Sequence, residues 1–434
     1  MNNERIMDDQ NVNNKIGLCG FQNIGNTCYM NSILQLLIHS KLIINFMLYK
    51  KNPFIADNLK DKSNDAEYIS YLETTIYYKI YEKKKKSNIF NNNIVINRSE
   101  VDNCMENTLT KKLADIINAI IYKGNSKITP TSFKQIIDLK ISTLRGYGQQ
   151  DSHELLNGFF DNLIEETGID SEPKINNVPN EIHNYIKYVE LQHKLISEEK
   201  DVETKRNLIS DYNEYKKKNY DIINKYNGLN YMMKIFKSIR SSNLDTSSTG
   251  FNPLIFNLIT FTVDIFTCQE CSSEHHTYQY HTIIILPVKF TIKECFQHYI
   301  NEELVSRNCE FCKHNKAMKK TKIWRPGMTL FIELNRFNII DNRLYKNNVS
   351  VEIPHELDIS EFCDNSMQLN SSFKYKLKGI SNHIGNMNGG HYTADCLSIV
   401  DNKTWYHFDD SNVSMYDGSN IDTSKAYIIL YELE

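Results

Sequence analysis

The segment GFQNIGNTCYMNS, residues 20–32, decides how the rest of the sequence is interpreted. Its glycine-containing turn leads into an apolar helix that we expect over residues 28–49, with Cys28 at the first position. The free N–H groups and the positive dipole end of a helix N-terminus favour a thiolate over a thiol. Cys28 is therefore a candidate nucleophile, and the alternative for the segment alone is a small buried thiol at a helix start.

Two segments near the C-terminus could complete a nucleophilic site. The segment GGHY, residues 389–392, places His391 after a glycine pair, where little side-chain bulk would cover the imidazole. The segment WYHFDD, residues 405–410, ends in Asp409 and Asp410. A carboxylate at the end of a strand adjacent to the histidine strand could bond the imidazole and fix its tautomer. Taken singly, a structural histidine and a surface turn are the alternatives.

The composition of the 434-residue chain excludes several classes of protein. A net charge of −3 argues against a nucleic-acid-coating or polybasic membrane protein. No apolar run reaches the length of a membrane span, and the polar residues 1–14 lack the apolar core of a signal peptide. We therefore expect an intracellular protein, cytoplasmic or nuclear. In a reducing compartment its cysteines would be core thiols, metal ligands or a nucleophile.

The texture of the sequence changes from helical to β-rich along the chain. Apolar residues recur at helical spacing over four further segments, at 67–81, 109–121, after the start signal Thr129-Pro130, and at 149–165. Residues 171–250 form a charged, tyrosine-rich insertion with a hint of a helical hairpin. Beyond residue 251 we expect short strands at 281–288, 329–337, 373–380, 391–400, 404–408 and 426–432. This order predicts an α+β fold.

Two Cys-x-x-Cys pairs favour a metal site. Cys268 and Cys271 form the first pair, and Cys309 and Cys312 form the second. Four thiolates can bind one Zn²⁺ tetrahedrally, which leaves no open position, so the zinc would be structural. The gap between the pairs suits a ribbon at the tip of two long β-arms. Four unrelated buried cysteines, or a redox pair, are the alternatives.

Three further segments complete a family pattern. These are QQDSHELL at residues 149–156, LNRF at 334–337 and AYIILY at 426–431. Together with the segments around Cys28 and His391, and in this order, they resemble the ubiquitin-specific proteases, papain-like cysteine proteases that remove ubiquitin. The resemblance implies a papain-like α+β fold with thumb, palm and fingers. The expected division is an N-terminal arm (1–14), a thumb (15–170), an insertion (171–250), fingers with the zinc ribbon (251–328) and a palm (329–434).

The resemblance also implies the roles of the catalytic residues. Cys28 falls on the nucleophile of the family, and His391 falls on its general base. Asp409 falls on the third member of the triad, with Asp410 as the secondary candidate. Asn23 falls on the side chain that stabilises the oxyanion.

The substrate implied by the resemblance is ubiquitin, or a protein that carries it. Only glycine passes a narrow channel beside the nucleophile, and ubiquitin ends in Gly-Gly. The family uses acidic residues to hold the basic ubiquitin tail, although acids also suit a solvated first helical turn. The positions assigned to substrate are Gln149, Asp151, Glu154, His383, Gly389 and Gly390.

Other functions remain as alternatives. The same machinery could process another ubiquitin-like modifier, or the chain could be a catalytically silent ubiquitin-binding scaffold. Nucleic-acid binding through the cysteine knuckles is opposed by the net charge. We expect no organic cofactor and no membrane or nucleic-acid partner. The insertion at 171–250 is either a surface elaboration or a docking site for an unidentified protein.

Overall fold

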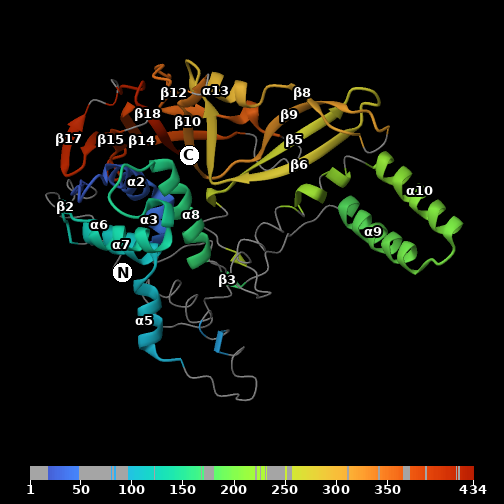
Figure 1. Cartoon of the computed structure of the whole chain (residues 1–434), viewed down its shortest axis with the longest axis horizontal. Helices are drawn as coiled ribbons and strands as arrows, with labels where there is room; N and C mark the ends of the chain where they lie inside the picture. Colours follow the sequence, from blue (N-terminus) through green and yellow to red (C-terminus); the bar gives the residue numbers. More distant parts are fainter. Residues whose placement is uncertain are drawn as a thin grey trace.

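The computed structural model describes residues 18–47, 80, 83–84, 96–121, 123–167, 169–170, 180–219, 222–224, 226–229, 231, 250–251, 257–309, 312–340, 343–364, 372–386, 389–416, 418 and 421–434. Within these residues helices dominate the first half of the chain and strands dominate the second (Figure 1). This arrangement confirms the expected α+β class. Among the helices of the described residues, none combines the length and the apolar character needed to cross a membrane.

The main sheet has the strand order β17-β16-β15-β14-β18-β10-β7, and β13 also pairs with β14. The pair β10–β7 is parallel, and the other pairs are antiparallel. The strands are β7 (Ile283–Pro287), β10 (Thr329–Asn335), β13 (Glu356–Asp358), β14 (Lys374–Asn386), β15 (Gly389–Leu397), β16 (Trp405–Asp409), β17 (Asn412–Tyr416) and β18 (Ala426–Leu433).

Helices of the N-terminal half cover one face of this sheet (Figure 1). The α2 helix is buried along its whole length. It lies close to β14: a Cβ added to Gly379 would be 2.8 Å from the side chain of Leu36. The elements are α2 (Cys28–His39), α3 (Lys41–Met47), α6 (Leu109–Ile121), α7 (Thr131–Lys140), the 3-10 turn η2 (Ser142–Leu144) and α8 (Ser152–Thr167). The helix α5 (Arg98–Glu106) contacts α6 and lies away from the sheet (Figure 1).

A second, four-stranded sheet has the order β6-β5-β9-β8 and extends away from the main sheet (Figure 1). Its strands are β5 (Thr260–Cys268), β6 (Glu274–His281), β8 (Glu303–Ser306) and β9 (Lys316–Arg325). Beyond it α9 (Asn180–Glu198) and α10 (Val202–Lys218) form a hairpin, in which the rings of Tyr188 and Tyr215 lie 3.8 Å apart.

The remaining short elements connect these layers. Strand β1 (Gly20–Phe21) is parallel to β2 (Lys127–Ile128), and the hairpins are β3 (Ile169–Asp170) with β4 (Gly250–Phe251) and β11 (Phe337–Ile340) with β12 (Arg343–Lys346). One apolar core lies between α2 and the main sheet. A second core contains α13 (Ile292–Tyr299), the 3-10 turn η3 (Ser360–Phe362) and side chains from the main sheet.

The expected helix over residues 28–49 is two helices, and the physical reason lies at Ser40. The Ser40 hydroxyl donates to the buried carboxylate of Glu432 at 2.8 Å and accepts from the Ile43 N–H at 3.3 Å. The Leu42 N–H donates to the same carboxylate at 3.2 Å. A serine that caps a new helix competes with continuation of the old one. The burial of Glu432, far along the sequence, therefore sets the break.

Other expected boundaries also shift. The helix expected after Thr129-Pro130 is α7, which begins at Thr131 directly after this pair. The strand expected over 329–337 is interrupted at Arg336, between β10 and β11. The helix expected over 67–81 lies outside the described residues, apart from Ile80.

Arg336 explains this interruption. Its side chain is fully buried, at 0% exposure. The guanidinium donates to the carbonyls of Asn347 at 2.8 Å, Val349 at 2.9 Å and Thr423 at 2.7 Å, and also to the carbonyl of Ala426 at the start of β18. Burial lowers its pKa to about 10, so the group stays charged at neutral pH. Arg336 therefore joins the link between β10 and β11 to two other segments, 347–349 and 423–426, through their backbone carbonyls.

We expect Arg336→Lys to lower the free energy of unfolding by about 3–5 kcal/mol, because one ammonium group cannot serve four carbonyls and leaves buried acceptors unpaired. Chemical denaturation followed by circular dichroism measures the change. The matched control is Arg98→Lys, at an exposed arginine whose Nε lies 2.9 Å from Asp102. That substitution should stay within about 0.5 kcal/mol of the parent. Equal effects at the two sites would contradict the role assigned to Arg336.

Candidate active site

Cys28 is the first residue of α2 and is 3% exposed. The loop before it is shaped by Asn23, whose Oδ1 accepts the N–H groups of Gly25 at 3.0 Å and Thr27 at 3.1 Å. Gly25 has φ +120° and Asn26 has φ +48°, so the loop needs residues that tolerate the left-handed region. The position expected from the sequence is confirmed: Cys28 lies where a turn opens a buried helix.

The electrostatics of Cys28 differ from the sequence expectation. Burial raises the pKa of its thiol, and the nearby Asp410 carboxylate raises it further. Backbone N–H groups of Tyr392, Tyr29 and Cys28 itself lower the pKa, but they do not outweigh burial. The helix N-terminus therefore favours the thiolate as expected, but the free protein does not hold Cys28 as a thiolate by this effect alone.

His391 and Asp409 form a hydrogen-bonded pair. The Nε2 atom of His391, on β15, lies 2.6 Å from Oδ1 of Asp409, at the end of the neighbouring strand β16. Both side chains are partly exposed. Because Nε2 is engaged by the carboxylate, Nδ1 is the ring nitrogen left to exchange a proton with a thiol.

Asp410 has partners different from those of Asp409. It has φ +49°, and its carboxylate accepts the amides of Asn23 at 3.0 Å and Asn31 at 2.7 Å. Its carbonyl accepts the N–H of Phe21 at 2.8 Å. The two adjacent acids thus divide, one toward the imidazole and the other toward the loop that precedes Cys28.

The Asn23 side chain is held at both ends. Its oxygen accepts backbone N–H groups of its own loop, and its nitrogen donates to Asp410. A primary amide nitrogen carries two hydrogens, and the bond to Asp410 uses one of them. Asn31, which donates to the same Asp410 carboxylate at 2.7 Å, is the residue of this network that sequence reasoning missed. The only available signal was its place within the 20–32 segment.

The segment from Gln149 approaches the Cys28 loop. The Gln149 amide donates to the Asn26 side chain at 3.3 Å, and the Asn26 amide donates to the carbonyl of Tyr147 at 2.8 Å. A Cβ on Gly25 would lie 3.0 Å from the Tyr147 ring. These contacts bring residues 147–149 alongside the loop that precedes Cys28.

The carboxylate of Asp151, an expected substrate contact, already accepts hydrogen bonds from within the protein. It caps α8, where its carboxylate accepts the His153 N–H at 2.7 Å. The Tyr427 hydroxyl, on β18, donates to the same carboxylate at 3.0 Å. Burial raises the pKa of Asp151. Glu154 lies in the first turn of α8 and is partly buried.

His383 lies beneath the glycine pair rather than on its surface. It is 4% exposed, its ring packs against those of Phe337, Tyr392 and Tyr427, and burial lowers its pKa to about 4. A Cβ on Gly390 would lie 2.3 Å from His383 Nε2, whereas Gly389 has open space around it. His383 therefore supports the backbone at Gly390, where a side chain would collide with it.

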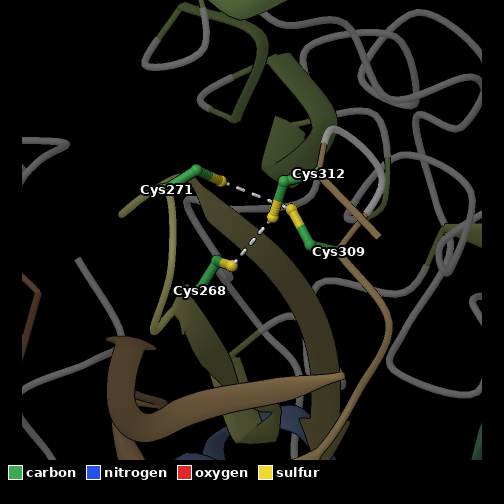
Figure 2. Close-up of side chains that lie close together, drawn as sticks. All are labelled: Cys268, Cys271, Cys309 and Cys312. Carbon is green, nitrogen blue, oxygen red and sulfur yellow. Dashed lines mark hydrogen bonds between the residues drawn. The ribbon is translucent and has the colours of Figure 1, made fainter. Parts of the chain in front are cut away.

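Four cysteines meet at the tip of the four-stranded sheet (Figure 2). The sulfurs of Cys268 and Cys312 lie 3.5 Å apart, and those of Cys271 and Cys309 lie 3.6 Å apart. Four sulfurs about 2.3 Å from a central ion would be separated by about 3.8 Å in a regular tetrahedron. The spacing fits a metal ion, and the cluster expected from the sequence is confirmed.

The two cysteine pairs sit on turns of the same form. The Ser272 N–H donates to the Cys268 carbonyl at 3.0 Å, and the Lys313 N–H donates to the Cys309 carbonyl at 3.1 Å. Ser272 and Lys313 both have positive φ, at +54° and +63°. Repetition of one strained turn at both pairs indicates a shared ligand rather than four unrelated thiols.

Comparison with known proteins places the chain in a family. The model of the family described as ubiquitin carboxyl-terminal hydrolase matches residues 19–431. A probable ubiquitin carboxyl-terminal hydrolase of Acanthamoeba polyphaga mimivirus is 27% identical over 98% of this chain and 92% of its own length. Ubiquitin carboxyl-terminal hydrolase 2 of Bos taurus is 25% identical over 98% of this chain, which spans 57% of that protein.

Solved structures share the fold. A structure of the yeast SAGA DUB module is similar with a TM-score of 0.56 at 18% identity, over 97% of this chain and 69% of the other. A SAGA DUB module bound to ubiquitin aldehyde gives 0.57 at 17% identity, over 97% and 70%. The match along nearly the whole sequence means that this protein belongs to the ubiquitin carboxyl-terminal hydrolase family of cysteine-type deubiquitinating enzymes.

Proposed function

We propose that this chain hydrolyses the bond after the C-terminal glycine of ubiquitin, with Cys28 as nucleophile. The single observation that carries the proposal is the His391–Asp409 pair at 2.6 Å beside a second network, Asp410 with Asn23, that shapes the loop entering Cys28. The family match over residues 19–431 supports it. One related structure is described as bound to ubiquitin aldehyde, which supports ubiquitin as the substrate.

The reaction proceeds through a thioester. His391 Nδ1 takes the proton of the Cys28 thiol, and the sulfur attacks the glycine carbonyl. The carbonyl oxygen becomes an oxyanion, which the Asn23 amide and the Cys28 N–H stabilise. The C–N bond then breaks as His391 returns its proton to the leaving amine. Water, deprotonated by His391, attacks the thioester carbonyl and releases the sulfur.

Asp409 orients the ring of His391 and stabilises the imidazolium. Because burial raises the pKa of Cys28, an ion pair with His391 is the means of forming the thiolate in this site. Asp410 positions Asn23 and does not touch the reacting atoms. The two adjacent acids thus have separate tasks, and Asp409 is the third member of the triad.

Substrate selection rests on the glycine pair and the α8 segment. Gly390 has no room for a side chain on its His383 side, whereas Gly389 has open space around it. In this proposal the backbone of the glycine pair borders the channel for the ubiquitin tail. Glu154 and Gln149 bind that tail from the α8 side. Asp151 contributes mainly by holding the start of α8 against Tyr427, with its negative charge as a secondary attraction.

Zn²⁺ at Cys268, Cys271, Cys309 and Cys312 has a structural role in this proposal. Four thiolates fill the tetrahedral coordination of zinc, so the ion supplies no chemistry and instead fixes the tip of the four-stranded sheet. The sheet then supports the globular body of ubiquitin. The α9–α10 hairpin is the place at which the insertion would bind another protein.

Ubiquitin with a C-terminal thiol-reactive warhead should form a covalent adduct with the wild type and none with Cys28→Ala, as measured by intact mass spectrometry. The matched control is Cys104→Ala, which removes an exposed thiol and should leave the adduct unchanged. An adduct with another ubiquitin-like modifier instead of ubiquitin would replace the substrate. No adduct with any modifier, in folded and reduced protein, would favour the scaffold.

Asn23→Ala should lower kcat for a ubiquitin C-terminal amide by about 10²–10³-fold, because it removes an oxyanion donor. The Kd for ubiquitin should change little, since the donor acts on the transition state. Steady-state kinetics measure kcat. Ubiquitin binding to Cys28→Ala protein, with and without Asn23→Ala, measures Kd, and the melting temperature checks the fold. A loss confined to binding would contradict the oxyanion role.

Elemental analysis should find one zinc per chain, and removal by a strong chelator should lower the melting temperature. Cys309→Ser should reproduce both effects, because three thiolates bind the ion more weakly. Cys104→Ser is the control and should retain the metal. An unchanged melting curve in metal-free protein would contradict the structural role proposed for zinc.

A further inference from the structure

A second histidine–carboxylate pair adjoins the pair of His391 and Asp409. His407 Nδ1, on β16, lies 2.6 Å from Oδ1 of Asp395, on β15. Asp395 and His407 are directly opposite in the β15–β16 ladder. Since side chains alternate along a strand, His391 and Asp395 share one face with His407 and Asp409. Each of the two strands therefore supplies the imidazole of one pair and the carboxylate of the other.

The Asp395 carboxylate is buried and has two hydrogen-bond partners. It is 4% exposed, and its second oxygen accepts the Asn382 amide, on β14, at 2.6 Å. An amide satisfies a lone pair but supplies no charge, and a buried carboxylate is costly without an opposite charge. His407 is the titratable group bonded to it. The bond to Asp395 is the main cause that raises the pKa of His407.

Among the described residues, two further charged groups act on His407. Asp409, two residues along β16, also raises the pKa of His407. Lys425, just before β18, lowers it. The opposite residue on β17 is Ser414, which is uncharged. Asp409 therefore lies on the same face of the sheet as two imidazoles, bonded to His391 and two residues along β16 from His407.

We propose that His407, hydrogen-bonded to Asp395, is a positioning residue that acts on Asp409 and, when it is protonated, thereby sets the proton affinity of His391. The inference rests on the proposed function, in which His391 exchanges protons with Cys28. A positive charge beyond Asp409 offsets part of the field by which Asp409 stabilises the His391 imidazolium. His391 can then release its proton to the leaving amine more readily than it could with Asp409 alone.

The test is the titration of His391 by NMR in protein labelled with ¹³C-histidine, in the Cys28→Ala background so that no thiol contributes. His407→Gln removes the charge and should raise the pKa of His391 by roughly half a pH unit, as expected for two charges separated by one carboxylate near the surface. His407→Lys keeps the charge and should leave the pKa of His391 at or below its parent value. His298→Gln, at an exposed position on α13, is the control.

Two further readings complete the test. The pKa of His407 itself should lie above its ordinary range, and Asp395→Asn should lower the pKa of His407. In protein that retains Cys28, the alkaline limb of the pH profile of kcat/KM for ubiquitin cleavage should move to higher pH in His407→Gln and not in His407→Lys. A structural role alone would lower the melting temperature of His407→Gln without moving this limb.

A His391 titration that is the same in the parent and His407→Gln would overturn the inference, as would equal shifts in the Gln and Lys variants. The titration needs no substrate, so it separates this inference from the proposed function. If the wild type cleaves no ubiquitin and forms no adduct, the proposed function fails, while the coupling of the two imidazoles is still decided by NMR.

Discussion

The hydrogen bonds of Asp410 are the constraint on which the arrangement of the site depends. Its carboxylate accepts Asn23 and Asn31, and its carbonyl accepts the Phe21 N–H. These bonds tie the loop and first turn around Cys28 to the turn between β16 and β17. The β15–β16 ladder fixes that turn relative to His391. Asp410, a residue with positive φ, therefore fixes the helical layer relative to the sheet at the place where the proposed mechanism brings the thiol and the imidazole together.

The sequence predicted the fold class, the segments of the site and the cysteine cluster, because each depends on local pattern. Cys28 at a helix start and the paired Cys-x-x-Cys turns are legible without knowing what lies across the fold. The family resemblance then ordered the segments into one site. Even the uncertainty between Asp409 and Asp410 was a real feature of the chain, since the structure gives each acid a different set of partners.

What the sequence could not predict depends on burial and on contacts between distant residues. The break at Ser40 depends on Glu432, and the occupation of Asp151 depends on Tyr427. Strand register places His383 under Gly390. It also pairs each histidine, His391 and His407, with an aspartate of the neighbouring strand. Register and burial are set by the whole sheet, so no local spacing reveals them.

The raised pKa of Cys28 and the role of Asp410 are two sides of one compromise. The carboxylate that orders Asn23 also places negative charge near the sulfur and disfavours the thiolate. Backbone N–H groups at the start of α2 and at Tyr392 oppose this effect, but burial exceeds them. The balance must come from a cation, and His391 is the group whose free nitrogen can supply it. In the proposed mechanism, Cys28 is therefore reactive only when His391 is correctly placed, which couples the strength of the nucleophile to the geometry of the sheet edge.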